Sequence, residues 1–201
     1  MTNIKTIGIA GCGTMGAGIA IVAARAGFRT IVFDERADAL EKARNQTQGF
    51  FAKSIEKGKL TTTRVDAIMD NLIGTTKIDD LAQCDLVIEA VFEDLKVKHA
   101  LLGALNKVCP THTVFASNTS TLSITEIAAG SGRDERVVGM HFCLPAQLMK
   151  LVEMSPGINT SDSAFQNAWE CCVALGQKPV KTKDNPGFIL NYFLVPFNND
   201  A

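Results

Sequence analysis

The feature that most constrains the fold is a succession of strand, glycine-rich loop, helix and strand at the start of the chain. An apolar run at residues 4–10 leads directly into the loop GCGTMG at 11–16. Residues 15–26 are rich in Ala and Ile and predict a helix, and residues 29–33 predict a second strand that is closed by Asp34. This order predicts a βαβ unit with its glycines at the turn between the first strand and the helix.

Each glycine of this loop has a physical task. Gly11 permits a tight turn, Gly13 lets the backbone approach a pyrophosphate, and Gly16 lets the helix pack closely against the strand. The helix start at Thr14 and Met15 presents free N–H groups and a partial positive charge to phosphates. We therefore expect these five residues to bind a dinucleotide cofactor.

Asp34 lies about 20 residues after the loop, where a carboxylate is expected to bind the ribose hydroxyls of a dinucleotide. Such a carboxylate disfavours a 2′-phosphate, so the sequence predicts NAD rather than NADP. The nearby Arg36 leaves NADP as the alternative. Strand, loop, helix and acidic residue agree with one another, which makes this signal stronger than a lone GxGxxG.

A membrane helix is the competing interpretation of the same segment. Residues 6–24 carry no charge and are long enough to span a bilayer, with small residues at helix-dimer spacing. However, five glycines fall within this stretch and would make a poor helix. A secretion signal would need a basic start and a cleavage site, and the start offers only Lys5. We expect no membrane segment.

Composition limits the remaining classes. The 201 residues carry a net charge of −1 and no basic run, so nucleic acid is not an expected partner. The six cysteines show neither CxxC nor zinc-ligand spacing, so no metal is expected. Most of them lie in apolar runs, which favours buried, reduced thiols and a reducing compartment, the cytoplasm.

The rest of the chain continues to alternate between strands and helices. This alternation predicts an α/β fold of Rossmann type, with a doubly wound, mostly parallel sheet. Ligands of such sheets bind beyond the carboxyl ends of the strands. The predicted helices are 38–57, 61–70, 94–108, 123–129 and 164–175, and the predicted strands are 72–75, 86–91 and 113–116.

Two apolar runs near residue 145 end in chemically active side chains. The first run, 137–140, ends at His141, and the second run, 148–152, ends at Glu153. If the runs are neighbouring strands, the two side chains meet at one sheet edge. A histidine oriented by a carboxylate is an acid/base pair suited to neutral pH. The alternative is that His141 is structural, as a lone histidine after a strand usually is.

Several motifs resemble those of one family, the L-3-hydroxyacyl-CoA dehydrogenases, including bacterial 3-hydroxybutyryl-CoA dehydrogenases. They cover essentially the whole chain and stand in the family's order. They are IAGCGTMGAGIA near the start, EAVFEDLKVK from Glu89, FASNTSTLSI from Phe115, GMHF and MKLVE around His141 and Glu153, and KDNPGFILN from Lys183. The resemblance implies NAD-dependent oxidation of a 3-hydroxyacyl-CoA, for which 3-hydroxybutyryl-CoA is the expected substrate, and the reverse reduction.

The resemblance also implies roles for individual residues. His141 would be the general base for the 3-hydroxyl, oriented by Glu153. Ser120 and Asn191 match positions that contact the reacting part of the substrate. Ser120 also matches a position beside the cofactor, although residues 117–120 could instead cap the next helix.

Three lysine and glutamate positions also match the family. Glu93 and Lys98 match positions near the nicotinamide half of NAD. Lys57 matches a basic residue near the CoA phosphates, and the alternative is that it lies on a solvated helix face. The family's amide in the motif after the histidine is replaced by Leu144, which cannot donate a hydrogen bond.

The resemblance further implies that the chain lacks most of a C-terminal helical domain that covers the acyl-CoA and forms a homodimer. We expect residues 1–184 to form the NAD-binding domain and residues 185–201 to supply the first helix of the second domain. That helix, 187–198, would leave its apolar face without its usual partners. The face comprises Phe188, Ile189, Phe193, Leu194 and Phe197.

The isolated chain is therefore expected to bind NAD with weak or absent turnover. Two other functions remain open at this point. One is an NAD-binding module without turnover, and the other is an NAD-dependent dehydrogenase of a free 3-hydroxy acid.

Overall fold

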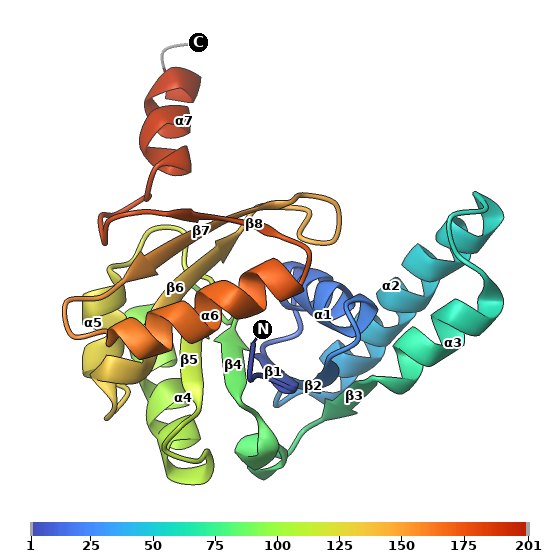
Figure 1. Cartoon of the computed structure of the whole chain (residues 1–201), viewed down its shortest axis with the longest axis horizontal. Helices are drawn as coiled ribbons and strands as arrows, with labels where there is room; N and C mark the ends of the chain where they lie inside the picture. The colour runs from blue at the N-terminus through green and yellow to red at the C-terminus, as the bar shows by residue number, and fades with distance from the viewer. Residues whose placement is uncertain (1, 200–201) are drawn as a thin grey trace.

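A computed structural model describes residues 2–199 and the side chains of residues 2–194. In this part of the chain, eight strands form one twisted sheet in the order β3-β2-β1-β4-β5-β6-β7-β8 (Figure 1). Strands β3 to β6 pair in parallel, β7 is antiparallel to β6, and β8 is parallel to β7. The strands are β1 (Thr6–Ala10), β2 (Arg29–Phe33), β3 (Leu72–Thr75), β4 (Leu86–Glu89), β5 (Val114–Ser117), β6 (Val137–Phe142), β7 (Leu151–Pro156) and β8 (Lys178–Lys181).

Helices cover both faces of the sheet. Helices α1 and α6 share one hydrophobic core with the sheet, and α4 and α5 share a second core on the opposite face. The helices are α1 (Thr14–Arg25), α2 (Ala37–Glu56), α3 (Thr62–Asp70), α4 (Leu95–Val108), α5 (Ile124–Ala129), α6 (Asp162–Ala174) and α7 (Leu190–Asn199), with short 3-10 turns η1 (Ile78–Gln83) and η2 (Asp134–Arg136).

The sequence explains both the two-sided core and the helix starts. Strand β4 reads Leu-Val-Ile, and its successive side chains enter opposite cores because side chains alternate across a strand. Helices α3, α4, α5 and α6 begin at side-chain oxygens that accept a backbone N–H of the first turn. The capping residues are Thr61, Asp94, Ser123 and Ser161.

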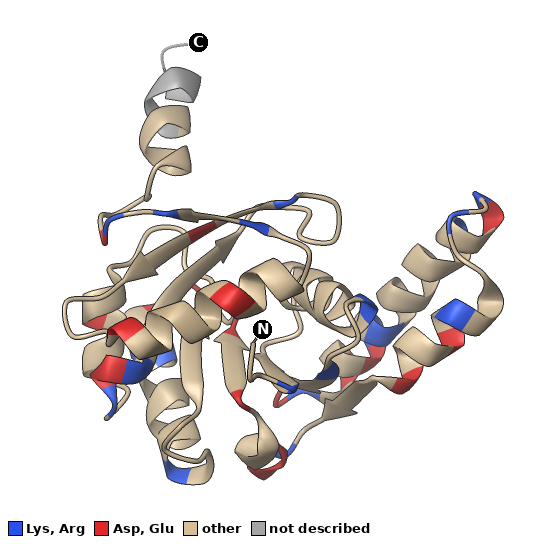
Figure 2. Ribbon diagram, viewed as in Figure 1, with Lys and Arg blue, Asp and Glu red and all other residues tan. Residues whose placement is uncertain are grey.

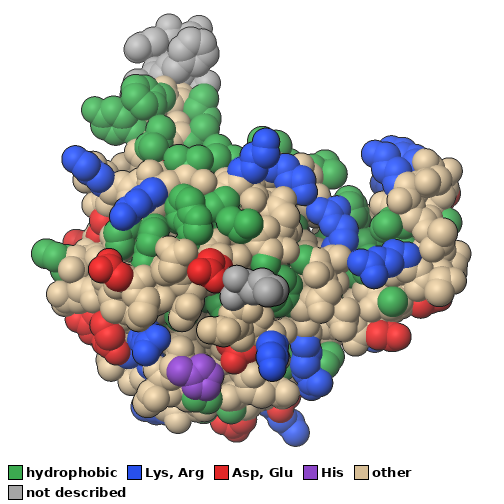
Figure 3. Space-filling view, in the orientation of Figure 1, with side chains coloured by type: hydrophobic (Ala, Val, Ile, Leu, Met, Phe, Trp, Pro, Cys, Tyr) green, Lys and Arg blue, Asp and Glu red, His purple; other side chains and the backbone are tan. Residues whose placement is uncertain are grey.

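Two parts of the molecule project from the sheet. Helices α2 and α3 form an arm whose base packs on α1 through Phe51 and Ile68 (Figure 1). The arm carries charges of both signs (Figure 2). Helix α7 projects at the other end, and hydrophobic side chains gather on its first turns (Figure 3).

The predicted α/β fold is confirmed, with three local differences. Strand β7 begins at Leu151 and runs to Pro156, so Glu153 lies inside the strand rather than at its end. Strand β8 was not predicted, because this largely exposed edge strand has no apolar run. Helix α7 begins at Leu190, after a turn in which Gly187 and Phe188 have positive φ.

The described residues contain neither a candidate membrane span nor a candidate metal cluster. No helix among them is long and apolar enough to cross a membrane. No group of three or more metal-ligating side chains was found among them either.

Candidate active site

The glycine loop connects β1 to α1 and leaves its backbone open toward a cavity. Gly11 has a φ of 93°, which favours glycine. A Cβ on Gly16 would lie 1.8 Å from the carbonyl oxygen of Gly11, so only glycine permits this approach of helix to loop. A Cβ on Gly13 would meet nothing within 4 Å, so the loop has open space on that side for a ligand.

The cavity beside this loop has a volume of about 740 Å³, within the usual range for small-molecule sites. Thr14 contributes to its wall, whereas Met15 packs against the core beneath. The cavity extends from the glycine loop past the end of β2 to an apolar wall. That wall includes Ile78, Val97, Leu101 and Ala104.

Asp34 stands at the end of β2, facing the glycine loop. Its Oδ2 accepts hydrogen bonds from the Cys12 backbone N–H at 3.0 Å and from the Cys12 thiol at 3.2 Å. Its Oδ1 accepts the backbone N–H of Arg36 at 3.1 Å. Burial, together with the bond to Asp34, raises the pKa of Cys12 to about 12, so the thiol stays protonated and able to donate.

These residues fit a dinucleotide. The open loop face beside Gly13 suits a pyrophosphate, the helix start at Thr14 supplies N–H groups, and the fixed carboxylate of Asp34 suits a ribose diol. Met15 does not line the cavity, because its side chain points into the core.

His141 and Glu153 lie directly opposite each other in the antiparallel pair β6–β7. His141 Nδ1 is 2.8 Å from Glu153 Oε2, and both side chains are buried. A carboxylate can only accept, so Nδ1 carries the proton and Nε2 keeps its lone pair. No described residue bonds to Nε2, which makes it the atom able to take a proton from a ligand.

The other oxygen of Glu153 is held from the start of α7. Glu153 Oε1 accepts the backbone N–H groups of Ile189 at 2.9 Å and Leu190 at 2.8 Å. The ring of Phe188 lies 5.7 Å from the imidazole of His141. The expectation that Phe188 belongs to an unpartnered apolar face is therefore wrong, because its own domain buries it. Ile189, Phe193 and Leu194 are exposed, and the side chain of Phe197 lies outside the described residues.

A second cluster of charges lies where β4 and β5 end. The Lys98 ammonium is 1% exposed and lies 2.8 Å from Glu89 Oε1 and 3.2 Å from Glu93 Oε2. Glu89 is fully buried, and it also accepts the hydroxyl of Ser117 and the backbone N–H of Val91. The ammonium of Lys98 is thus enclosed by carboxylates. Its bonds to Glu89 and Glu93 therefore stabilise the structure.

Glu93 fixes the loop after β5. Its Oε1 accepts the Thr119 hydroxyl at 2.5 Å, the Ser120 N–H at 2.9 Å and both the N–H and hydroxyl of Thr121. Burial alone would raise the pKa of Glu93, but the Thr119 hydroxyl and the Lys98 charge lower it to about 2. The carboxylate is therefore ionised at neutral pH and holds Ser120 in place.

The other residues singled out from the sequence differ in whether they contact the site. Asn191 joins the site, since its Nδ2 donates to the Ser120 carbonyl at 3.4 Å. Leu144 is 62% exposed in the loop that follows β6. Lys57 caps the C-terminus of α2, exposed on the arm, and no described hydrogen bond or ion pair links it to these residues.

The residues that sequence reasoning missed hold the site together. Glu89 carries a visible signal, a carboxylate inside an apolar strand. Cys12, Asp184 and Phe188 lie within quoted motifs, but the motifs do not indicate the contacts that these residues make. Asp184, for example, accepts hydrogen bonds from Ser123, Ile124 and Thr125 at the start of α5, contacts that only the fold creates.

Comparison with known proteins identifies the family. Residues 6–185 match the family model described as "3-hydroxyacyl-CoA dehydrogenase, NAD binding domain". The 3-hydroxyadipyl-CoA dehydrogenase of Escherichia coli K12 is 41% identical over 201 residues, covering 100% of this chain and 42% of the relative. A probable 3-hydroxybutyryl-CoA dehydrogenase of Bacillus subtilis is 39% identical, covering 99% of this chain and 69% of the relative.

A solved structure shows the same fold. The crystal structure of (S)-3-hydroxybutyryl-CoA dehydrogenase from Ralstonia eutropha superposes with a TM-score of 0.96 at 36% identity, covering 98% of this chain and 70% of that one. The chain thus spans between 42% and 70% of the length of these three relatives. The cofactor of the family is NAD, and the chain belongs to the 3-hydroxyacyl-CoA dehydrogenase family, whose NAD-binding domain it contains.

Proposed function

We propose that the protein oxidises an L-3-hydroxyacyl-CoA, 3-hydroxybutyryl-CoA in the first place, to the 3-ketoacyl-CoA with NAD, and catalyses the reverse reduction. The observation that carries this proposal is the His141–Glu153 pair, which leaves Nε2 free in a chain that also has a dinucleotide cavity. The relatives named for this reaction support the substrate class.

The mechanism follows from which atoms remain available. When bound, NAD supplies the hydride acceptor. His141 Nε2 takes the proton of the 3-hydroxyl, while Glu153 stabilises the imidazolium that forms and keeps the ring in the reactive tautomer. In the reverse direction the same nitrogen returns the proton to the 3-keto oxygen.

Ser120 and Asn191 are proposed to bind the reacting end of the substrate, and Ser120 also to contact the cofactor. Their support is the bond between the Asn191 amide and the Ser120 carbonyl, and the anchoring of Ser120 by Glu93. Lys98 is proposed to act through Glu93, because its ammonium is enclosed. Lys57 is proposed for the CoA phosphates on the family resemblance alone.

The parts of the proposal that concern the longer protein rest on the relatives' greater length. We propose that residues 1–184 form the cofactor domain and that residues 185–201 begin a second domain that completes the acyl-CoA site and a homodimer. The exposed Phe193 and Leu194 on α7 support this reading. All six cysteines are buried and form no disulfide, which supports a reducing, cytoplasmic location. A role in short-chain fatty acid metabolism is proposed on the family resemblance alone.

An NAD-binding module without turnover is the second candidate. Leu144 favours it, because an exposed leucine stands where the family has a hydrogen-bonding amide. The free 3-hydroxy acid is a less supported substrate, since every relative named above acts, by its name, on a CoA thioester.

One experiment separates these functions. NADH binding is measured by fluorescence on the chain, and NADH oxidation is followed on the same sample with acetoacetyl-CoA and with acetoacetate. Turnover with the thioester alone supports the proposal. Turnover with the free acid at equal efficiency would replace the substrate class, and binding without turnover would favour the module.

A further inference from the structure

Five charged side chains gather at the mouth of the cofactor cavity, between the end of β2 and the first turns of α2. Asp34, Glu35 and Asp38 are acidic, and Arg36 and Lys42 are basic. A 2′-phosphate on the adenosine ribose is what distinguishes NADP from NAD. A site that accepts this phosphate needs a cation available beside the ribose. The pairing of these charges therefore bears directly on cofactor choice.

Asp34 cannot turn away from the ribose position. Three donors fix its carboxylate, two from Cys12 and one from the backbone of Arg36. Because both of its oxygens are engaged from the protein side, the negative charge remains beside any bound ribose. A 2′-phosphate placed there would meet a fixed like charge.

Arg36 is one of the two cations at the cavity mouth, its backbone N–H is bonded to Asp34, and its guanidinium is already engaged. Its Nε donates to Asp38 Oδ1 at 3.1 Å, and its Nη2 donates to Asp38 Oδ2. This two-point fork is the geometry with which arginine binds either a carboxylate or a phosphate. Asp38 thus occupies the groups that would otherwise bind a phosphate.

We infer that Asp38 is a cofactor-specificity residue: it holds the Arg36 fork and so withholds from the ribose the cation that would receive a 2′-phosphate. NADP is then rejected twice, by the fixed charge of Asp34 and by the occupied fork of Arg36. This inference rests on the cofactor part of the proposed function and names the residue that sets its selectivity.

The pair is solvent-exposed, with side-chain exposures of 71% and 69%, so it contributes little to the stability of the fold. Because of this exposure, an effect of the substitution on cofactor binding can be separated from an effect on folding. Asp38→Asn keeps the shape of the side chain and removes its charge. We expect the ratio of NADPH to NADH dissociation constants, measured by cofactor fluorescence at low ionic strength, to fall about threefold to fivefold.

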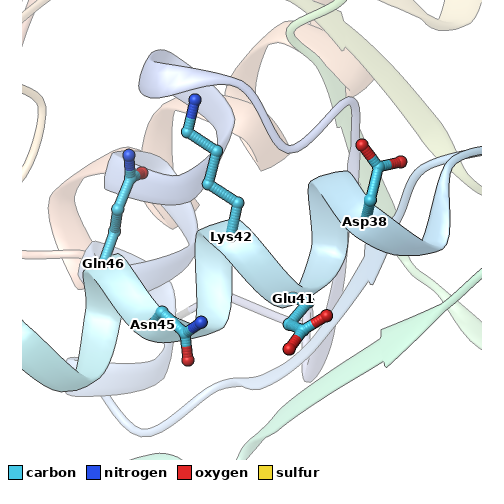
Figure 4. Close-up of a pocket in the computed structure, with 5 residues that line it drawn as sticks. All are labelled: Asp38, Glu41, Lys42, Asn45 and Gln46. Atoms are coloured by element: carbon cyan, nitrogen blue, oxygen red, sulfur yellow. The ribbon is translucent and has the colours of Figure 1, made fainter.

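Glu41 supplies a matched control. It lies about one turn further along α2 but does not line the cofactor cavity, and Figure 4 shows its carboxylate pointing in a different direction from that of Asp38. Glu41→Gln removes the same charge from the same helix without freeing Arg36. We expect this variant to leave the ratio within about twofold of the unaltered chain.

Two further variants test the route through Arg36. Adding Arg36→Gln to Asp38→Asn should abolish the gain, because no fork is left to bind the phosphate. Adding Asp34→Ser should enlarge it beyond the product of the single effects, because the fixed like charge is also removed.

The inference is overturned if Asp38→Asn shifts the ratio no more than Glu41→Gln, or if the shift persists without Arg36. Failure of the unaltered chain to bind NADH would overturn it together with the cofactor assignment. Normal NADH binding without acetoacetyl-CoA turnover would instead count against the proposed reaction alone and leave the specificity test intact.

Discussion

Two clusters that join carboxylates to nitrogen-bearing side chains lie at the carboxyl ends of the central strands, and they differ in which atoms are left without a partner among the described residues. In the cluster formed by Glu89, Lys98 and Glu93, the ammonium is enclosed and bonded to both carboxylates. In the pair formed by His141 and Glu153, one ring nitrogen is bonded and the other has no described partner.

This difference distinguishes a cluster that stabilises the fold from a pair that can exchange a proton. A buried charge whose bonds are all made fixes the backbone around it, and here it fixes the loop that carries Ser120. A buried acid/base pair with a free lone pair can exchange a proton with a ligand. Removing a member of the first cluster should therefore affect stability, and removing His141 should affect turnover.

The largest effect is expected from Lys98→Met. It leaves Glu89 buried without its counter-charge, which should lower the free energy of unfolding by about 3–5 kcal/mol. Urea unfolding followed by circular dichroism measures this. The double variant E89Q/K98M restores neutrality and should recover part of the loss. No recovery would show that packing of the lysine stem, rather than charge, dominates.

His141→Gln tests the other side of the comparison. Turnover with acetoacetyl-CoA should fall about a hundredfold, corresponding to about 2.7 kcal/mol of lost general-base catalysis. NADH affinity should remain close to that of the unaltered protein, because the cavity beside the glycine loop does not include His141. A loss of stability comparable to that of Lys98→Met would mean that this pair is structural too.

Glu93 tests the comparison through the pH dependence of the free energy of unfolding. Its pKa is lowered from 4.5 to about 2, so the ionised form favours the folded state. The resulting stability is present above about pH 4.5 and is lost as the pH falls toward 2. Because the side chain is 37% exposed, we expect only about 1 kcal/mol. Glu93→Gln should therefore be less stable than the unaltered chain at pH 6 and nearly equal to it near pH 2.

The smallest expected effect concerns Leu144→Asn. Restoring the amide that the family carries at this position should raise turnover about threefold to tenfold, the scale of one hydrogen bond. The measurement is kcat with acetoacetyl-CoA, with Leu148→Asn as a control at another exposed leucine of the same loop. Equal turnover in both variants and the unaltered protein would remove Leu144 as an explanation for weak activity.

The sequence was sufficient for features that depend on local pattern. The order of glycines at Gly11, Gly13 and Gly16 predicted the loop, and alternating apolar runs predicted the doubly wound sheet. The pairing of His141 with Glu153 was also anticipated, although the phase of β7 was not. The apolar run that includes Leu148 predicts a strand, but Leu148 lies in the exposed loop before β7.

Features that depend on distant contacts were not predictable in this way. The sequence pattern around Lys98 predicts a helix, but only the meeting of β4 with α4 places its ammonium between Glu89 and Glu93. The thiol of Cys12 meets Asp34 across 22 residues of sequence, a contact that no spacing rule indicates. Each such contact can be identified only when the three-dimensional fold is known.

The contacts between Glu153 and the N–H groups of Ile189 and Leu190 have a consequence for inheritance. They show that the turn leading into α7, although it follows the last strand, is hydrogen-bonded to β7. An exchange with a relative just after residue 184 would replace the segment whose backbone N–H groups donate to Glu153. Shuffling between relatives should therefore succeed more often when the breakpoint falls after residue 191, so that the segment carrying these donors travels with the sheet.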